Sequence, residues 1–184
     1  MMSSLNVTNR PALRALLLAQ RHCMSAAERQ SREAALVKQL ALYIEQHHTT
    51  ATIALYMPHA GEPDLLALAA FINNPLCLPV VINRGEPLQF AQWRAGDALI
   101  KDRYGIQTPA IQVWISPQLL LIPCVGYTNE AFRLGYGGGY YDRTLAALKS
   151  SDSAVTAVGI AWSQAGCGFQ VNEYDIAMDK MLLA

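Results

Sequence analysis

The sequence has no excess of charge of either sign. Its 184 residues include 14 Lys and Arg against 14 Asp and Glu, so the formal net charge is zero. Binding to nucleic acid depends on a basic surface that neutralises phosphates. We therefore expect no nucleic acid partner.

Long apolar runs are also missing. No uninterrupted apolar stretch approaches the roughly 20 residues that span a bilayer. The first ten residues lack the basic start and the apolar centre of a signal peptide. We expect a cytoplasmic protein with no membrane partner.

The cysteines and histidines lack the close spacing of metal ligands. The four cysteines are Cys23, Cys77, Cys124 and Cys167, and none belongs to a Cys-x-x-Cys pair. This argues against a zinc site and favours reduced, buried thiols. With 52% apolar residues, the chain can bury one core, so we expect a single domain over residues 1–184 and a monomer.

Two helices are expected within the first 47 residues. Thr8 or Asn9 can cap the first, and Ser25-Ala-Ala-Glu28 is a capping box that opens the second. The apolar residues expected on their buried faces are Leu13, Leu16 and Leu17 in the first helix and Leu36, Leu40 and Ile44 in the second.

From residue 52 onward, short β-branched runs alternate with helical ones. The expected strands are 52–57, 76–82, 119–125 and 154–162, and the expected helices are 63–72 and 140–149. This alternation favours an α/β fold: a mostly parallel, open, Rossmann-like sheet in three layers, with helices on both faces and an N-terminal helical pair. Residues 87–93 alternate with period 2 and predict an antiparallel edge strand.

A glycine-rich segment lies between the third of these strands and the helix 140–149. Gly135, Gly137, Gly138 and Gly139 fall within five positions. A glycine loop at a helix N-terminus exposes backbone N–H groups that favour an anion such as phosphate. The loop lacks the Gly-Lys-Ser or Gly-Lys-Thr ending of a Walker loop. A purely structural turn is the alternative.

Charged residues near this loop strengthen the phosphate interpretation. Arg133 and Arg143 flank the glycines, and Asp142 could hold Mg²⁺ on the same phosphates. Arg10 and Arg14 are one helical turn apart and could clamp a polyphosphate. Two solvated surface arginines are the alternative for that pair.

The segment Arg133-Leu-Gly-Tyr-Gly-Gly-Gly-Tyr-Tyr-Asp142 resembles the signature of the 5-formyltetrahydrofolate cyclo-ligases, and weaker similarity extends over nearly the whole chain. The resemblance implies ATP-dependent cyclisation of 5-formyltetrahydrofolate to 5,10-methenyltetrahydrofolate, through phosphorylation of the formyl oxygen and with release of ADP and phosphate. ATP and a reduced folate would be the partners, with Mg²⁺ as cofactor. No covalent nucleophile is implied.

The resemblance also assigns residues to each ligand. The ATP-binding residues it implies are Arg10, Arg14, Arg133, Leu134, Gly135, Tyr136, Gly137, Gly138, Gly139, Tyr140 and Tyr141. The folate-binding residues it implies are Met57, Glu62, Tyr136, Gly137, Gly138, Gly139 and Tyr140. The implied magnesium ligands are Asp142 and Asp175.

Three departures from the family pattern leave alternatives open. Arg10 replaces the common Lys, Thr108 stands where Glu is frequent, and residues 127–132 form a different turn. One alternative is a non-catalytic module that binds a nucleotide or phosphometabolite. The other is an ATP-dependent ligase or kinase with a different acceptor.

Overall fold

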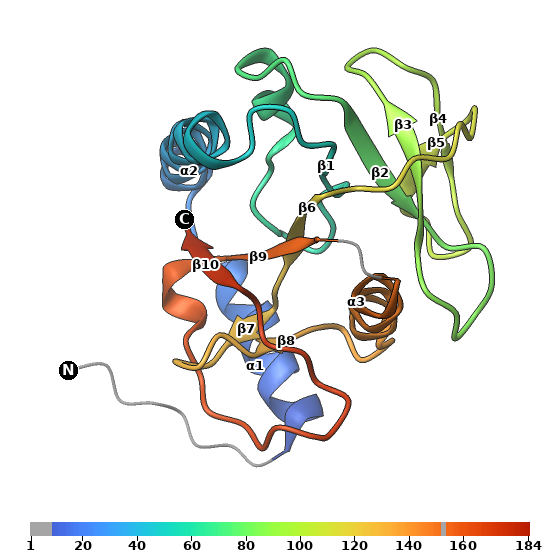
Figure 1. The fold of residues 1–184 in the computed structure, drawn as a ribbon. Helices are drawn as coiled ribbons and strands as arrows, with labels where there is room; N and C mark the ends of the chain where they lie inside the picture. Colours follow the sequence, from blue (N-terminus) through green and yellow to red (C-terminus); the bar gives the residue numbers. More distant parts are fainter. Residues whose placement is uncertain (1–8, 152–153) are drawn as a thin grey trace.

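A six-stranded sheet forms the centre of the computed structural model, which describes residues 9–151 and 154–184 (Figure 1). The strand order is β10-β9-β6-β1-β2-β3. The strands are β1 (Ile53–Ala54), β2 (Leu76–Val80), β3 (Gln89–Trp93), β6 (Leu119–Pro123), β9 (Thr156–Ala161) and β10 (Lys180–Leu183). Four neighbouring pairs are parallel, and β3 pairs with β2 antiparallel at one edge. The predicted mostly parallel sheet is confirmed, and the antiparallel strand lies at the predicted edge.

Alternate residues along the strands build two cores, one on each face of the sheet. Ile53 and Leu119 pack on the side of helix α2 (Ala26–His47). Their successors Ala54 and Leu120 pack on the side of helix α3 (Tyr140–Ser150). This alternation follows from the period of a strand, whose successive side chains point to opposite faces. Figure 1 shows the two helices on opposite sides of the sheet, which confirms the three-layer prediction.

Helix α1 (Arg10–Arg21) covers neither face of the sheet. Asn9 caps it, accepting a hydrogen bond from the Ala12 N–H at 3.4 Å, whereas the alternative cap, Thr8, lies outside the described residues. The helix packs on a third core cluster beyond the strand ends; its buried residues are Leu13, Leu17, Val125, Leu134, Ala165 and Cys167. Leu16 is 39% exposed, so its predicted place on the buried face is wrong. The contact is a narrow i, i+4 line through Leu13 and Leu17.

Helix α2 follows the predicted pattern closely. The Ser25 hydroxyl accepts a hydrogen bond from the Glu28 N–H at 3.2 Å, which is half of a capping box. The Glu28 carboxylate instead lies 2.7 Å from the Arg32 guanidinium, one turn further on. The residues predicted for its buried face, Leu36, Leu40 and Ile44, are all buried.

Several elements differ from the prediction. The helix expected over 63–72 is a short 3₁₀ helix, Leu66–Ala70, because Asp64 forms a turn in which its carboxylate accepts the Leu66 N–H at 2.8 Å. Two small hairpins were not predicted: β4 (Leu99–Lys101) with β5 (Gln107–Pro109), and β7 (Gly126–Tyr127) with β8 (Arg133–Leu134). The second hairpin lies between β6 and the glycine loop and turns that loop toward α1.

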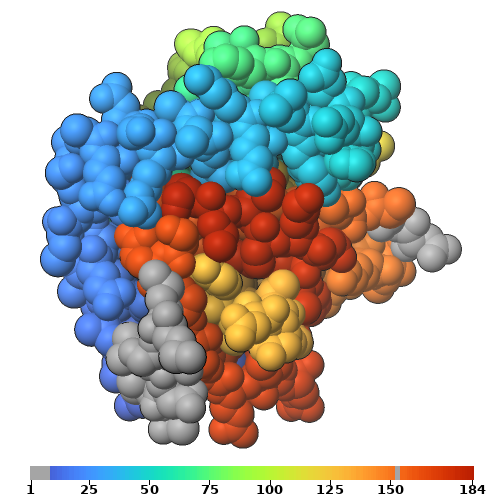
Figure 2. Space-filling view, turned by 90° about the vertical axis from the view of Figure 1, so that its left-hand side faces the viewer, coloured from blue at the N-terminus to red at the C-terminus, as the bar shows by residue number. Residues whose placement is uncertain are grey.

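The C-terminal strand β10 was also missed by the sequence analysis. It pairs with β9 in parallel at the edge of the sheet, directly after the polar segment 171–179. Figure 2 shows the C-terminal segment (red) between the N-terminal helices (blue) and the region of the β7–β8 hairpin (yellow). Through this arrangement the polar segment before β10 lies near α1.

Candidate functional site

The glycine loop joins β8 to the N-terminus of α3. Gly137 and Gly139 have φ of 96° and 64°, a region that favours glycine. Gly139 is the N-cap residue, and within the described residues no side chain caps the helix. The first N–H groups of α3 are therefore available to an anion, as the sequence predicts.

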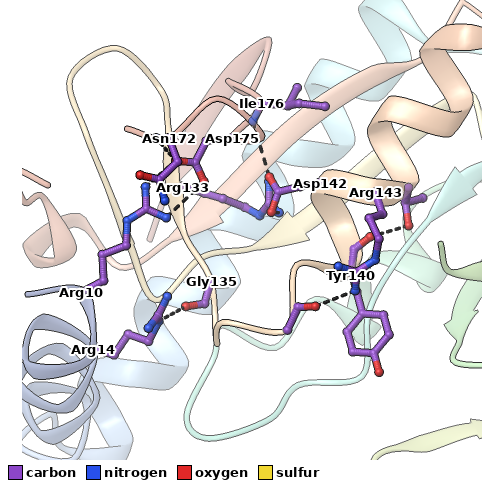
Figure 3. A network of polar contacts seen from close by, with 12 residues as sticks. Arg10, Arg14, Arg133, Gly135, Tyr140, Asp142, Arg143, Asn172, Asp175 and Ile176 are labelled. Carbon is purple, nitrogen blue, oxygen red and sulfur yellow. Dashed lines mark hydrogen bonds and ion pairs between the residues drawn. The ribbon is translucent and has the colours of Figure 1, made fainter. Parts of the chain in front are cut away.

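Helix α1 places Arg14 against this loop. The Arg14 Nε donates to the Gly135 carbonyl oxygen at 2.6 Å (Figure 3). A Cβ on Gly137 would lie 3.5 Å from the Arg14 guanidinium, an ordinary contact, so the arginine packs directly against the loop. Burial, and then the nearby charge of Arg10, lower the pKa of Arg14.

Arg10 contacts the segment before β10. Its Nη1 donates to Asp175 Oδ1 at 3.1 Å, and its Nη2 pairs with Asp175 Oδ2. Nη2 also donates to the Gln170 carbonyl oxygen at 2.7 Å, and the guanidinium lies 4.8 Å from the centre of the Phe169 ring. Although burial raises the pKa of Asp175, hydrogen bonds from Arg10 and the Asn172 N–H outweigh it and leave that pKa lowered.

Asp142, in the first turn of α3, lies beside the same segment. Its Oδ2 is 2.8 Å from Arg133 Nη2, and its Oδ1 accepts the Ile176 N–H at 3.4 Å. Ile176 directly follows Asp175, so the structure brings the two carboxylates predicted to hold a metal to one place (Figure 3). Each is neutralised by an arginine.

These two carboxylates fit a metal ion that other ligands help to hold. In residues 9–151 and 154–184, no three His, Cys, Asp or Glu side chains gather into a metal cage. Mg²⁺ is commonly held by one or two carboxylates together with substrate phosphates and waters. The donor set therefore suits an ion shared with a polyphosphate.

The site is electropositive and has unused hydrogen-bond donors. Four arginines surround two carboxylates; the arginines are Arg10, Arg14, Arg133 and Arg143. Arg143 Nη2 donates to the Gly138 carbonyl oxygen at 2.6 Å. Within the described part of the chain, the buried Arg133 Nη1 and Arg143 Nε have no partner. Buried donors without partners are costly, and an anion would satisfy them.

Glu62 lies at the carboxyl end of β1, across from the glycine loop. It is 4% exposed, and its Oε2 accepts the His59 N–H at 2.8 Å. Burial raises the pKa of Glu62 to about 7, although the His59 N–H, the Tyr136 hydroxyl and Arg21 act to lower it. The Tyr136 hydroxyl donates to the His59 carbonyl oxygen at 3.3 Å, so the glycine loop touches the turn that carries Glu62.

Three other residues near the site have buried side chains. Met57 is buried in the core on the α2 side. Trp162, at the end of β9, is fully buried; its Nε1 donates to the Gly61 carbonyl oxygen at 2.8 Å, and Arg29 lies 5.0 Å from its ring. Thr108, at the position where family members often have Glu, is buried in β5.

Two residues that the site assignments omit lie at its margins. Arg21, the last residue of α1, is buried and contacts both Ala60 and Tyr136. Its place seven residues after Arg14 on the same helix was a signal for it. Tyr104, from the β4–β5 hairpin, has its hydroxyl 2.5 Å from that of Tyr140 at the start of α3. The sequence carries no signal for this contact.

Two cavities of about 310 Å³ each lie away from these residues, beside β2 and β3. One is lined by Ile72, Asn74, Gln92 and Arg94 among others, at the opposite end of the sheet from the glycine loop. Neither cavity contains a pair of carboxylates or a glycine loop. The charged site is therefore the better candidate. Within the described residues, no helix is long and apolar enough to cross a membrane.

Fold and site together define an α/β protein with a glycine-rich anion loop, an arginine cluster and paired carboxylates at the carboxyl ends of parallel strands. Residues 6–183 match the model of the 5-formyltetrahydrofolate cyclo-ligase family. The chain belongs to that family, which confirms the resemblance carried by the Arg133–Asp142 motif and makes the chain an enzyme of the ligase class.

Individual relatives agree with this assignment. The chain is 27% identical to the 5-formyltetrahydrofolate cyclo-ligase of Mycoplasma pneumoniae over 93% of its own length and 96% of that protein. Its match to the Mycolicibacterium smegmatis protein of the same name is 30% identical and spans 51% of this chain and 54% of that one. A solved 5,10-methenyltetrahydrofolate synthetase from Mycoplasma pneumoniae has the same fold, with a TM-score of 0.75 and 24% identity over 94% of this chain and 97% of that chain.

Proposed function

We propose that this chain catalyses the ATP-dependent cyclisation of 5-formyltetrahydrofolate to 5,10-methenyltetrahydrofolate, with release of ADP and phosphate. Membership of the family supports the reaction. One contact supports the site: the Tyr136 hydroxyl, on the glycine loop, donates to the His59 carbonyl oxygen three residues before Glu62. An anion loop and a buried carboxylate thus face each other, as transfer from a nucleotide to a folate requires.

The nucleotide phosphates bind at the glycine loop. Backbone N–H groups at the start of α3 and the unpaired donors of Arg133 and Arg143 support this placement. The residues assigned to ATP are Arg10, Arg14, Arg133, Leu134, Gly135, Tyr136, Gly137, Gly138, Gly139, Tyr140 and Tyr141.

Asp142 and Asp175 hold Mg²⁺ in this proposal. Their oxygens suit a hard cation, and their closeness through the Ile176 N–H supports a shared site. When bound, the ion neutralises charge on the phosphoryl oxygens. Arg10 and Arg133 pair with these carboxylates, and Arg14 and Arg143 contact the glycine loop, so all four are close enough to help bind the phosphates.

The folate binds across the glycine loop, at the turn that carries Glu62. The carboxylate of Glu62 accepts hydrogen bonds from the ring and amino N–H groups of the pterin, a paired donor edge. Met57, buried at the end of β1, packs beneath the same region. The other residues assigned to the folate are Tyr136, Gly137, Gly138, Gly139 and Tyr140.

The chemistry asks for position and charge neutralisation rather than a covalent nucleophile. The formyl oxygen attacks the γ-phosphorus, and the bond to ADP breaks. N10 then attacks the activated carbon and loses its proton to water, and the carbon–oxygen bond breaks to release phosphate. The arginines stabilise the phosphoryl charge, and the glycine loop and Glu62 hold the reacting groups together.

The ultraviolet spectrum of the purified protein with 5-formyltetrahydrofolate at neutral pH tests the function. The methenyl chromophore should appear only when ATP and Mg²⁺ are both present, and EDTA should stop its growth. Samples without protein control for spontaneous ring closure. If ATP binds and no methenyl product forms, the chain is a nucleotide-binding module or a ligase or kinase with another acceptor. A cytoplasmic location, a monomeric state and the absence of nucleic acid or membrane partners stay predictions.

A further inference from the structure

Arg21 donates hydrogen bonds to three segments at the carboxyl ends of the strands. Its side chain is 2% exposed. Nη2 donates to the Cys124 carbonyl oxygen after β6 at 2.6 Å. Nη1 donates to the Ala60 carbonyl oxygen after β1 at 3.3 Å and to the Tyr136 hydroxyl of the glycine loop at 3.1 Å. A single guanidinium thus joins the proposed folate-binding turn to the proposed phosphate loop.

The partners of this buried cation are unusual. Within the described residues, its hydrogen bonds go to two carbonyl oxygens and a phenol, and its buried Nε has no partner. Removing a guanidinium from water without a paired carboxylate costs several kcal/mol. An apolar side chain could fill the space at lower cost. We therefore expect the positive charge of Arg21, or its hydrogen-bond donors, to have a function at this position.

The turn that Arg21 holds is strained. Ala60 has φ of 46° and Gly61 has φ of 72°. A left-handed alanine is unfavourable and persists only where its surroundings fix it. Arg29 Nη1 and Trp162 Nε1 donate to the Gly61 carbonyl oxygen at 2.9 and 2.8 Å, and Arg29 Nη2 donates to the Arg21 carbonyl oxygen at 2.9 Å. These bonds fix the turn that ends at Glu62.

We propose that Arg21 is a positioning residue for the folate: it aligns the Glu62 turn with the Tyr136 hydroxyl and places its positive charge beside the carboxylate that accepts the pterin N–H groups. This inference rests on the proposed function and deepens it. Arg21 acts through Glu62 and Tyr136 and contacts no reacting atom.

The surroundings of Glu62 agree with this role. Burial raises the pKa of Glu62 to about 7, and Arg21 is the cation that acts against that rise. The other titratable groups that face Glu62 are Tyr56 after β1, Cys124 after β6, Tyr136 from the glycine loop and Tyr141 from α3. All four are neutral at neutral pH, because the ordinary pKa values of Tyr and Cys lie above 7 and burial raises the pKa of each further. Arg29, whose Nη1 donates to the Gly61 carbonyl oxygen at 2.9 Å, is the other cation at this turn.

The test measures the dissociation constant of 5-formyltetrahydrofolate across pH, without ATP, in the wild type and in Arg21→Gln. We expect binding at neutral pH to weaken by about tenfold or more, which corresponds to a rise of at least one unit in the Glu62 pKa. Affinity should recover in part as the pH rises, because only the effect of the lost charge depends on pH, so the midpoint of the profile shifts upward. A profile weakened equally at every pH would overturn the proposal.

Arg29→Gln is the matched control. It removes a half-buried guanidinium that holds the same turn through Gly61 but has no contact with Tyr136 among its hydrogen bonds. This variant should have a lower free energy of unfolding. The pH at which its folate affinity changes should be the same as in the wild type. If Arg21→Gln does not fold, Arg21→Lys replaces it. That variant keeps the charge, so its pH profile should match the wild type while its affinity stays lower.

A double-mutant cycle tests the hydrogen bond itself. The effects of Arg21→Gln and Tyr136→Phe on folate affinity should be smaller together than their sum, because each removes the same link. Additive effects would count against the alignment role. If the wild type forms the methenyl product and Arg21→Gln keeps the wild-type pH profile of folate affinity, the inference about Arg21 is wrong and the proposed function stands. A wild type that binds no folate overturns the proposed function as well.

Discussion

The guanidinium of Arg10 contacts both carboxylate oxygens of Asp175, 165 residues further along the chain. The same arginine donates to the Gln170 carbonyl oxygen, and Asp175 accepts the Asn172 N–H at 2.7 Å. One ion pair therefore fastens the segment before β10 to the first turn of α1. It also sets Arg10 in competition with any metal ion for Asp175.

Removal of Arg10 should release the segment before β10 and should also free Asp175 for a metal ion. In Arg10→Gln, amide exchange across residues 170–175 should become faster, because the bidentate ion pair is lost. ATP affinity should fall by about tenfold, since hydrogen bonds to charged groups contribute roughly 1.5–3 kcal/mol. Mn²⁺, used as a probe for Mg²⁺ without nucleotide, should bind more tightly. Arg32→Gln, which loses an ion pair with Glu28 and hydrogen bonds to Ser163 and Gln164 but no contact with Asp175, should change none of these. Unchanged exchange in Arg10→Gln would contradict the fastening role.

Asp142→Asn should stop turnover while the protein stays folded. The amide keeps an oxygen for Arg133 and loses the charge that a metal ion needs. We expect the rate of methenyl formation to fall by about 100-fold or more, the order seen when a stabilising group is removed from a charged transition state. Glu173→Gln, an exposed carboxylate in the same polar segment as Asp175, is the control and should keep wild-type activity. Normal turnover in Asp142→Asn would refute the metal assignment.

Glu62 makes the stability of the protein depend on pH. Its pKa is about 7 in the folded chain against 4.5 ordinarily, so the unfolded chain binds fewer protons between these values. The free energy of unfolding therefore falls as pH rises from about 4.5 to about 7, by on the order of 3 kcal/mol. Glu62→Gln should remove this fall. Thermal melts near pH 5 should match the wild type, and near pH 8 the variant should melt at a higher temperature.

The same variant, Glu62→Gln, should bind folate poorly. A side-chain amide at this position cannot accept two N–H groups as a carboxylate does, so the affinity for 5-formyltetrahydrofolate should fall by about tenfold or more. The affinity for ATP should change much less, because Glu62 lies on the opposite side of the site from the arginine cluster. Calorimetric titration with each ligand alone separates the two. Equal loss of both affinities would argue against the folate role.

Gly126→Ala should loosen α1. A Cβ there would lie 2.6 Å from Leu17 Cδ1 and 2.7 Å from Cys167 Sγ, so these side chains, through which α1 is packed, must shift. Overpacking of this kind costs typically 1–3 kcal/mol. The melting temperature and the ATP affinity should fall together, since α1 carries Arg10 and Arg14. Gly166→Ala is the control, because its Cβ would meet Tyr127 only at 3.6 Å.

The parts of the fold that follow from local periodicity were predictable. The cap at Ser25, the alternating edge strand 87–93 and the glycine loop before α3 all carry their signal within a few residues. Strand β10 was hidden because a polar segment precedes it and it is only four residues long. The β7–β8 hairpin has two-residue strands, too short for any period to show.

The residues of the site could largely be predicted from the sequence, but the contacts between them could not. The motif indicated Arg133, Asp142 and the glycines, and the structure brings them together. The contact between Arg10 and Asp175 depends on the parallel pairing of β9 with β10. The spacing of residues in the sequence does not indicate this pairing. Arg21 could be grouped with Arg10 and Arg14 from the sequence, but its burial was not expected, because arginine is rarely buried. Its burial depends on carbonyl oxygens at the ends of two strands.

Trp162 gives the molecule an internal optical reporter. Its indole is fully buried, hydrogen-bonded to the Gly61 carbonyl oxygen and stacked beneath the Arg29 charge, so its emission depends on the turn that carries Glu62. In a Trp93→Phe, Trp114→Phe background, any ligand that moves this turn changes the fluorescence of a single tryptophan. The folate half of the site can thus be followed in real time, without a label and without turnover.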